Sequence, residues 1–247
     1  MTMRKLLLIA ASILVLVAAA TALVVSRSGR EWTTVSPAAL AEFEQGLQDI
    51  GKLYHPEAAE HFERAIELDP DFLAPKVWLL QERGIISREK ANELVVDLKG
   101  RDLARVTPRE RLLVEYLLAL VDHQPARAEA ILSDYLARHP DDPYAIELSC
   151  GQLWERNRWP EAEAAYRRLI ATDPNRVEAQ NRLGYLALAQ GRFAEAEEQF
   201  EIYRYIAPDQ PNPHDSLGEL LMLVGRWREA RQELEEALRI KPDFCPS

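Results

Sequence analysis

Prolines recur along this chain at a fixed interval. Pro140, Pro174, Pro208 and Pro242 form one series, and each lies 34 residues after the one before it (174−140, 208−174 and 242−208). Other columns keep the same interval, namely Gly184 and Gly218, Gly191 and Gly225, Ala162, Ala196 and Ala230, and Trp159, Phe193 and Trp227. A period of this length is typical of stacked supersecondary units, in which each unit covers the hydrophobic face of its neighbour. The sequence therefore predicts an elongated repeat array, which offers a long surface for binding.

Each repeat is expected to be a helix, a turn and a second helix. From position 37 onward, apolar residues recur three and four positions apart, as in Phe193, Ala196 and Phe200, which is the spacing of one helix face. Helix boundaries are expected at the Asp-Pro pairs 69–70, 142–143 and 173–174, because a residue before proline disfavours the α conformation.

The clearest helix start is the segment Thr107-Pro108-Arg109-Glu110. Threonine is a good N-cap residue, and proline fits the first helical position. Glu110 stands three residues after the cap, so its carboxylate is predicted to accept a hydrogen bond from the backbone N–H of Thr107.

The last three periods resemble the tetratricopeptide repeat family in register. Unit 177–210 carries Leu183, Gly184, Gly191, Phe193, Ala196, Phe200 and Pro208, and unit 211–244 carries Leu217, Gly218, Gly225, Trp227, Ala230, Leu234, Ala237 and Pro242. Unit 143–176 carries Trp159, Ala162, Tyr166 and Pro174, with Cys150 where the family usually has a small glycine. Small residues in these columns let two helices approach closely, and the aromatic residues fill the space beyond them.

The resemblance weakens toward the N-terminus. Unit 39–72 keeps Gly46, Ala58, Phe62, Ala65 and Pro70, and unit 109–142 keeps Ala128, Leu132 and Pro140, whereas residues 73–106 lack most of the pattern. The resemblance therefore implies an all-α, right-handed superhelical solenoid of about six helix pairs, with divergent units over 38–142 and well-matched units over 143–247. The C-terminal half is most similar to the repeat tails of bacterial serine/threonine kinases and cyclases, through the segment 203–213, although no catalytic domain is present in this sequence.

The first thirty residues form a separate segment. Leu6 to Val25 is an apolar run interrupted only by Ser12 and Thr21, and as a helix it would span about 30 Å, the thickness of a hydrocarbon core. Its length favours an uncleaved transmembrane signal anchor over residues 1–30, with residues 31–37 as a tether. The alternative is a cleaved signal peptide with Ala20-Thr21-Ala22 as the cleavage site. Flanking positive charge favours a cytoplasmic N-terminus, which would place the C-terminal domain outside the cytoplasm, in the periplasm.

Charge and cysteine content exclude several kinds of partner. The formal net charge is −10, and residues 1–30 contribute four basic residues and no acid, so the remainder carries 26 basic and 40 acidic residues (30−4 and 40−0). Such a surface repels nucleic acid, and no nucleic-acid partner is expected. Cys150 and Cys245 are the only cysteines. They belong to units that are not neighbours in the array, so no disulfide is expected, and two thiolates cannot form a zinc site alone.

Motifs for catalysis are absent from the sequence. It contains no phosphate-binding Gly-rich loop followed by lysine, no Gly-x-Ser-x-Gly elbow and no His-Glu-x-x-His pair. The five histidines, His55, His61, His123, His139 and His214, are not spaced as a metal-binding pair on one helix face. The chain is therefore predicted to be non-catalytic and to need no cofactor or metal. A hydrolase within the divergent region 73–108 is the competing hypothesis.

The family resemblance implies that the first helix of each pair lines a concave groove. The positions carried over to this face are Tyr144, Glu147, Trp154, Glu178, Asn181, Tyr185, Asn212, Asp215 and Glu219. Some relatives hold a peptide's terminal carboxylate with a lysine–asparagine clamp. Here Glu178, Asp215 and Glu219 stand where basic residues would be needed, so the resemblance implies an acidic groove for an extended basic or amide-rich segment. The alternative is a hydrated groove whose aromatic residues only complete the packing between units.

The leading functional hypothesis is a membrane-anchored protein–protein interaction scaffold, with the assembly or maturation of envelope proteins as its most concrete version. The alternative is a sensory or regulatory module that acts on a separate kinase or cyclase. Two prolines after Lys241 prevent a further capping helix. Leu234, Leu238 and Phe244 are therefore expected to be partly exposed and to form a homodimer or client contact through the C-terminal helix, unless Phe244 folds back over the other two.

Overall fold

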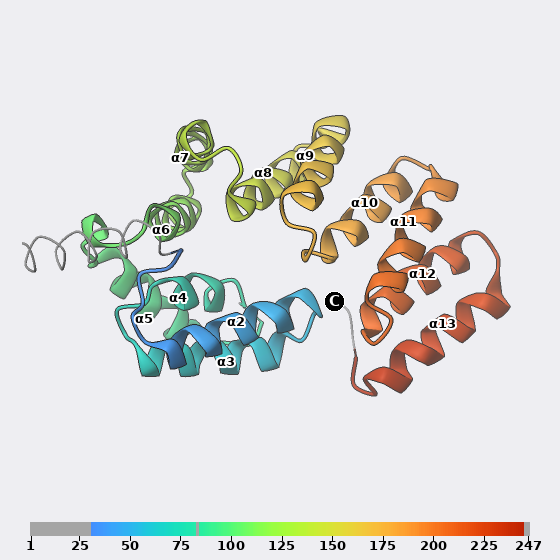
Figure 1. The fold of residues 1–247 in the computed structure, drawn as a ribbon, viewed down its shortest axis with the longest axis horizontal. Coiled ribbons are helices and arrows are strands. Elements are labelled where there is room, and N and C mark those ends of the chain that lie inside the picture. Colours follow the sequence, from blue (N-terminus) through green and yellow to red (C-terminus); the bar gives the residue numbers. More distant parts are fainter. Residues whose placement is uncertain (1–30, 83, 245–247) are drawn as a thin grey trace, which may run out of the picture.

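The computed structural model describes residues 31–82 and 84–244. Within these ranges the chain forms twelve α-helices and one short 3-10 helix, and no strand. Figure 1 shows that the helices follow one another along an arc. No helix in the described ranges is both long enough and apolar enough to cross a membrane. The predicted membrane segment, Leu6 to Val25, lies outside the described residues, as does Cys245.

The helices come mainly as pairs joined by tight turns. Their bounds are α2 (Pro37–Gly51), α3 (His55–Leu68), α4 (Ala74–Leu79), α5 (Arg88–Lys99), η1 (Leu103–Arg105), α6 (Pro108–Val121), α7 (Pro125–Arg138), α8 (Pro143–Glu155), α9 (Trp159–Thr172), α10 (Glu178–Ala189), α11 (Phe193–Ile206), α12 (Pro211–Leu223) and α13 (Trp227–Ile240). The helices of five pairs, α2–α3, α6–α7, α8–α9, α10–α11 and α12–α13, pack extensively on each other.

The divergent period 73–106 departs from this plan. It supplies two helices, as predicted, but α4 has only 6 residues. Helix α4 packs on α3 and α6 rather than on α5. The expected sixth regular pair is therefore not formed. The physical reason is the missing small-residue columns of this period, which elsewhere let the two helices of a pair approach.

The glycine columns stand where the two helices of a pair touch. A Cβ built on Gly184 would lie 2.6 Å from Cδ1 of Phe200, and one built on Gly218 would lie 2.8 Å from Cδ2 of Leu234. In the first pair, Gly46 faces Phe62 in the same way, with 2.5 Å to Cε1. These distances are shorter than any normal carbon–carbon contact. The prediction that small residues allow close helix packing is confirmed at these positions.

A second column explains the turns inside the pairs. His123, Asn157, Gly191 and Gly225 follow one another at intervals of 34 residues (157−123, 191−157 and 225−191) and all have positive φ, at 56°, 56°, 71° and 80°. This left-handed conformation is strained for residues that carry a Cβ. In the last two units the residue with positive φ is glycine, which adopts this conformation without strain. In the two preceding units it is His123 or Asn157, whose backbone is strained.

The helix start at Thr107 differs in part from the prediction. The Thr107 hydroxyl accepts a hydrogen bond from the Glu110 backbone N–H at 3.3 Å, as expected of an N-cap. The Glu110 carboxylate does not reach back to the Thr107 N–H, so the reciprocal half of the expected capping box is wrong. It accepts instead from the backbone N–H groups of Thr33 at 2.6 Å and of Leu73 and Ala74 at 3.1 Å each.

Glu110 consequently joins three distant segments of the chain. Its side chain is fully buried, and burial raises the pKa of its carboxyl group, an effect that the three N–H donors oppose. The donors at 73 and 74 belong to the start of α4. A carboxylate at a helix start satisfies N–H groups that have no partner within the helix.

The arc ends against its own beginning. Lys241, just after α13, donates a hydrogen bond of 2.6 Å to the carboxylate of Glu57 on α3, 184 residues earlier. Phe244 is buried, as the fold-back alternative requires, whereas Leu238 is 51% exposed.

Candidate binding cavity

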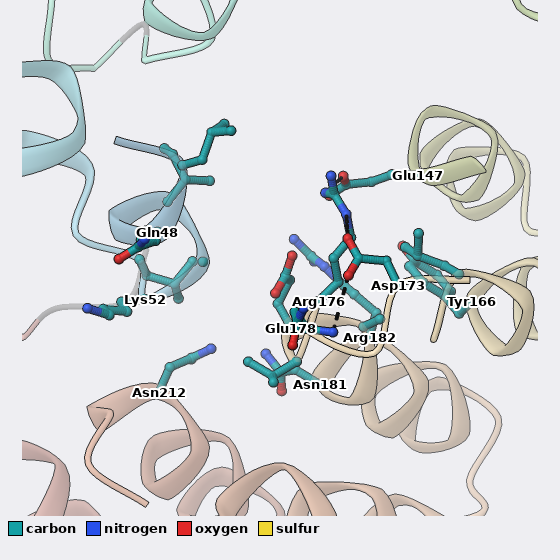
Figure 2. Close-up of a pocket in the computed structure, with 18 of the residues that line it drawn as sticks. Gln48, Lys52, Glu147, Tyr166, Asp173, Arg176, Glu178, Asn181, Arg182 and Asn212 are labelled. Carbon is teal, nitrogen blue, oxygen red and sulfur yellow. Dashed lines mark hydrogen bonds and ion pairs between the residues drawn. The ribbon is translucent and has the colours of Figure 1, made fainter. Parts of the chain in front are cut away.

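A cavity of about 800 Å³ lies on the inner side of the arc. Its wall is formed by the end of α2 and the turn into α3, by α8, by the α9–α10 connection with the start of α10, and by the start of α12. Figure 2 shows Gln48 and Lys52 on one side of the space, facing Glu178, with Asn212 on a third side. This volume is within the range of pockets that bind ligands.

Six of the nine predicted groove residues line this cavity. They are Tyr144, Glu147, Trp154, Glu178, Asn181 and Asn212. Tyr185, Asp215 and Glu219 lie outside its lining, because α10 and α12 pack together where these side chains emerge. The Tyr185 hydroxyl donates to a Glu219 carboxylate oxygen at 2.6 Å and lies 3.3 Å from the Ser216 hydroxyl.

The cavity is of mixed charge rather than acidic, which corrects the sequence-based expectation. Arg176 forms ion pairs with Glu147 and, at 3.1 Å, with Asp173. Lys52 and Arg182 add two more positive groups to the lining. Sequence position alone did not indicate these cations, because Lys52 and Arg176 belong to turns and Arg182 is not one of the groove positions that the family resemblance implies.

Glu178 is the carboxylate of the lining whose environment is least favourable to its charge. Burial raises the pKa of its carboxyl group, and the neighbouring charge of Glu147 raises it further, while Arg176 opposes both effects. Because Arg176 is already paired with Glu147 and Asp173, Glu178 remains a partly buried acid beside the cavity. A cation brought into the cavity would lower the pKa of Glu178.

Two amide oxygens of the lining are buried without a hydrogen-bond partner. One is Oδ1 of Asn181, a residue that is only 8% exposed, and the other is Oε1 of Gln210. Asn212 differs, because its Nδ2 donates to the Tyr203 hydroxyl at 3.2 Å. A buried acceptor without a partner costs free energy, so a donor that reached either oxygen after a small movement of the wall would be stabilised.

The aromatic residues of the predicted groove also pack within the protein. The Tyr144 ring lies edge-on to Trp32 and Trp78, at centroid distances of 5.2 and 5.7 Å. The guanidinium groups of Arg109 and Arg176 lie 4.9 and 4.2 Å from the same ring. Burial raises the pKa of Tyr144. Tyr144 therefore joins α8 to the N-terminal helices in addition to lining the cavity.

Sequence analysis missed the side of the cavity that α2, α3 and α4 provide. Gln48, Lys52, His55 and Trp78 line the cavity, yet they precede the well-matched repeats by about two periods or more. The repeat pattern relates residues of neighbouring units, so it could not indicate these residues. They come to lie opposite α10 only because the whole array is curved.

Three of the five histidines, His55, His61 and His214, lie against carboxylates. His55 lies 2.8 Å from Glu82, and His214 lies 2.7 Å from Glu233. Across residues 31–82 and 84–244, no group of three or more His, Cys, Asp or Glu side chains is arranged to hold a metal ion. Cys150 is buried, and burial raises the pKa of its thiol to about 12, so this thiol is not a reactive thiolate.

Comparison with known protein families decides the assignment of the repeat. Residues 152–211, from the end of α8 to the start of α12, match the family described as tetratricopeptide repeat. Residues 152–211 therefore carry the tetratricopeptide repeat pattern. The match falls on the units in which the sequence keeps the family's small and aromatic columns. No curated protein matches the chain.

Solved tetratricopeptide and related helical-repeat structures resemble this one at low identity. A structure of MamA from MSR-1 is 17% identical, with a TM-score of 0.48, and the match covers 68% of this chain and 92% of that one. PilF of Pseudomonas aeruginosa is 18% identical, with a TM-score of 0.46 and coverage of 82% and 76%. The Cut9–Hcn1 hetero-tetramer of the APC/C is 14% identical, with a TM-score of 0.53 and coverage of 83% and 40%. The last likeness supports the fold alone.

Proposed function

We propose that this protein is a membrane-anchored, non-catalytic tetratricopeptide scaffold whose inner cavity binds an extended, donor-rich segment of a partner protein. The observation that carries the proposal is the set of acceptors on the α10–α12 side of the cavity. Glu178 is a partly buried carboxylate, and the amide oxygens of Asn181 and Gln210 have no partner.

Acceptors of this kind select hydrogen-bond donors. Lysine, arginine, asparagine and glutamine side chains supply such donors, and a backbone N–H supplies another. A basic or amide side chain near Glu178 would form a charge-assisted hydrogen bond, which is stronger than one between neutral groups. The apolar parts of the segment would rest on Trp154 and Tyr166, which also line the cavity. The ion pairs of Arg176 leave Glu178 available for such a ligand.

Fluorescence anisotropy with three labelled peptides of equal length tests the proposal. One alternates Lys and Asn, one alternates Glu and Asp, and one contains only Ser and Gly. The Lys/Asn peptide is expected to bind best. Glu178→Gln should weaken its binding roughly tenfold to a hundredfold, since a hydrogen bond to a charged group is worth about 1.5–3 kcal/mol.

Asp215→Asn is the matched control, because it removes an acid of the neighbouring helix that does not line the cavity. Binding should also weaken as the pH falls through the raised pKa of Glu178, where the carboxylate becomes neutral. Equal affinity for the three peptides, or equal losses in Glu178→Gln and Asp215→Asn, would refute the site.

The membrane part of the proposal rests on the apolar run from Leu6 to Val25 and the basic residues that flank it. We expect the full-length chain to remain with membranes after high-salt and alkaline washing, with its repeats accessible to protease from the periplasmic side. A mature N-terminus at Leu23 would show instead that the segment is cleaved.

Assembly or maturation of envelope proteins is the version of this function that the proposed periplasmic placement favours. The second candidate is a regulatory module for a separate kinase or cyclase, favoured by the similarity of residues 203–213 to kinase- and cyclase-linked repeats. Capture of partners from solubilised membranes by the parent protein and by Glu178→Gln distinguishes the two candidate functions. Envelope proteins captured by the parent but not by the variant support the assembly function, and a captured kinase or cyclase supports the regulatory function.

A further inference from the structure

We propose that Lys241 is a latch that holds the two ends of the array together and controls entry into the cavity. The proposal deepens the proposed function, on which its ligand-binding part rests. It begins from a contact between residues that the repeat pattern places at opposite ends of the array. The Lys241 ammonium lies 2.6 Å from a Glu57 carboxylate oxygen and 4.4 Å from the centre of the Tyr54 ring.

The latch residues are held in place by their own elements. Glu57 stands in the first turn of α3, and Lys241 is the C-cap residue directly after α13. The Lys241 side chain is 18% exposed. Its hydrogen bond to Glu57 raises the pKa of the lysine and lowers that of the glutamate. Both groups are therefore charged at neutral pH and attract each other across the seam between the two ends.

The seam is weak compared with the rest of the array. Helices within a pair pack extensively, but neither α2 nor α3 packs extensively on α12 or α13 within the described part of the chain. The second carboxylate oxygen of Glu57 is buried with no hydrogen-bond partner. A partly exposed ion pair is worth little, and an unpaired buried oxygen opposes closure. Opening the seam consequently costs far less than separating two units of the array.

The cavity lies across this seam. Gln48 and Lys52 belong to the first helix pair, whereas Glu178 and Asn212 belong to later units, and all four line the same space (Figure 2). A Cβ on Gly51 would lie 3.7 Å from a carboxylate oxygen of Glu178, so the two walls come close at this point. A long segment that enters from the side must pass between these walls, and release of Lys241 would let them separate.

Spin labels that replace exposed residues on either side of the seam measure the opening directly, without a ligand. Suitable positions are Glu60 on α3 and Arg239 on α13, in the full-length chain with Cys245→Ser to avoid a third label. We expect Lys241→Gln to raise the population at longer distance about twofold to fivefold, the range that loss of a partly exposed ion pair produces. Added salt should act in the same direction in the parent protein.

Two further variants keep the result interpretable. The single variants Lys241→Glu and Glu57→Lys should each reduce the short-distance population. The double variant, in which the two charges are exchanged, should restore most of it. Lys99→Gln removes a comparable ion pair with Asp122 away from the seam and should leave the distances unchanged. Identical distance distributions in the parent, Lys241→Gln and high salt would overturn the latch.

The Lys/Asn peptide tests the control of entry. Its association rate constant should rise in Lys241→Gln by the same factor as the open population. A shift in distance with an unchanged association rate would refute the control of entry. If the distances shift but the peptide does not bind the parent protein, the proposed function fails while the latch stands. If the peptide binds and the distances do not shift, only the latch fails.

Discussion

Replacing Gly184 with alanine probes the packing on which the array depends. Gly184 lies inside α10 and faces the Phe200 ring of α11, which is fully buried. An alanine Cβ would lie 2.6 Å from Cδ1 and 2.8 Å from Cζ of this ring. Because the ring is fully buried, relieving this contact requires the ring or the two helices to shift within a packed interior.

The magnitude follows from two opposing terms. Alanine is favoured over glycine within a helix by about 1 kcal/mol. Overpacking a well-filled contact costs roughly 1–3 kcal/mol, and a contact this short falls toward the upper end of that range. The net change is a loss of about 1–2 kcal/mol in the free energy of unfolding.

Gly151→Ala is the control for the helix-propensity term. Gly151 lies inside α8, and a Cβ there would meet nothing within 4 Å. This variant should gain about 0.5–1 kcal/mol, because only the propensity term acts. The two substitutions are chemically identical, so the sign of their difference isolates the contact with Phe200.

Urea unfolding followed by far-ultraviolet circular dichroism measures both variants against the parent. A third variant, Gly184→Ala with Phe200→Leu, should recover part of the loss, because a leucine faces the equivalent glycine in the last unit. A Gly184→Ala protein that is as stable as the parent would refute the assigned register of this pair.

Three other predictions concern the turns, an acid on α12 and the last helix. His123→Gly should raise the free energy of unfolding by roughly 0.5–1 kcal/mol, because glycine adopts the positive φ at this turn without strain; a loss in chemical denaturation would contradict this. Burial and the charge of Glu219 raise the pKa of Asp215 to about 6 from 3.8. The folded state therefore binds more protons between these values, and stability should fall as the pH rises from about 4 to about 6. Asp215→Asn should remove this pH dependence and stabilise the protein at neutral pH by about 1–3 kcal/mol, whereas parallel stability profiles for the variant and the parent would count against the burial. Sedimentation across a concentration series should show self-association that Leu238→Glu abolishes, since this side chain is 51% exposed on the last helix, and a strictly monomeric parent protein would rule it out.

Much of the fold could be read from short-range periodicity. Helix pairs arise because apolar residues at helical spacing must be covered by the next unit, and the 34-residue interval records that requirement in the sequence. Gly184 and Gly218 marked the contacts inside their units correctly, since close approach of two helices leaves few residue types that fit. The period 73–106 lacks these columns, and there α4 has only 6 residues and packs on α3 and α6.

The candidate site, like the fold, could be predicted only where it follows the repeat pattern. Residues of α8, α10 and α12 that follow the repeat pattern, such as Glu178 and Asn181, line the cavity. Asp215 and Glu219 follow the pattern equally well but lie outside the lining. Their position depends on how α12 is set against α10, which is determined by packing between units rather than by spacing within one.

The sequence by itself determined what is local: helices, turns and the small-residue contacts within a pair, because these depend on residues at most one period apart. Only the tertiary structure decided what depends on the sum of many small rotations between units. It brought Gln48 and Lys52 opposite Glu178, and it brought Lys241 to Glu57. Glu110 shows the same division within one residue. Its place at a helix start was evident from the sequence, but its three N–H donors come from segments that meet only in the folded chain.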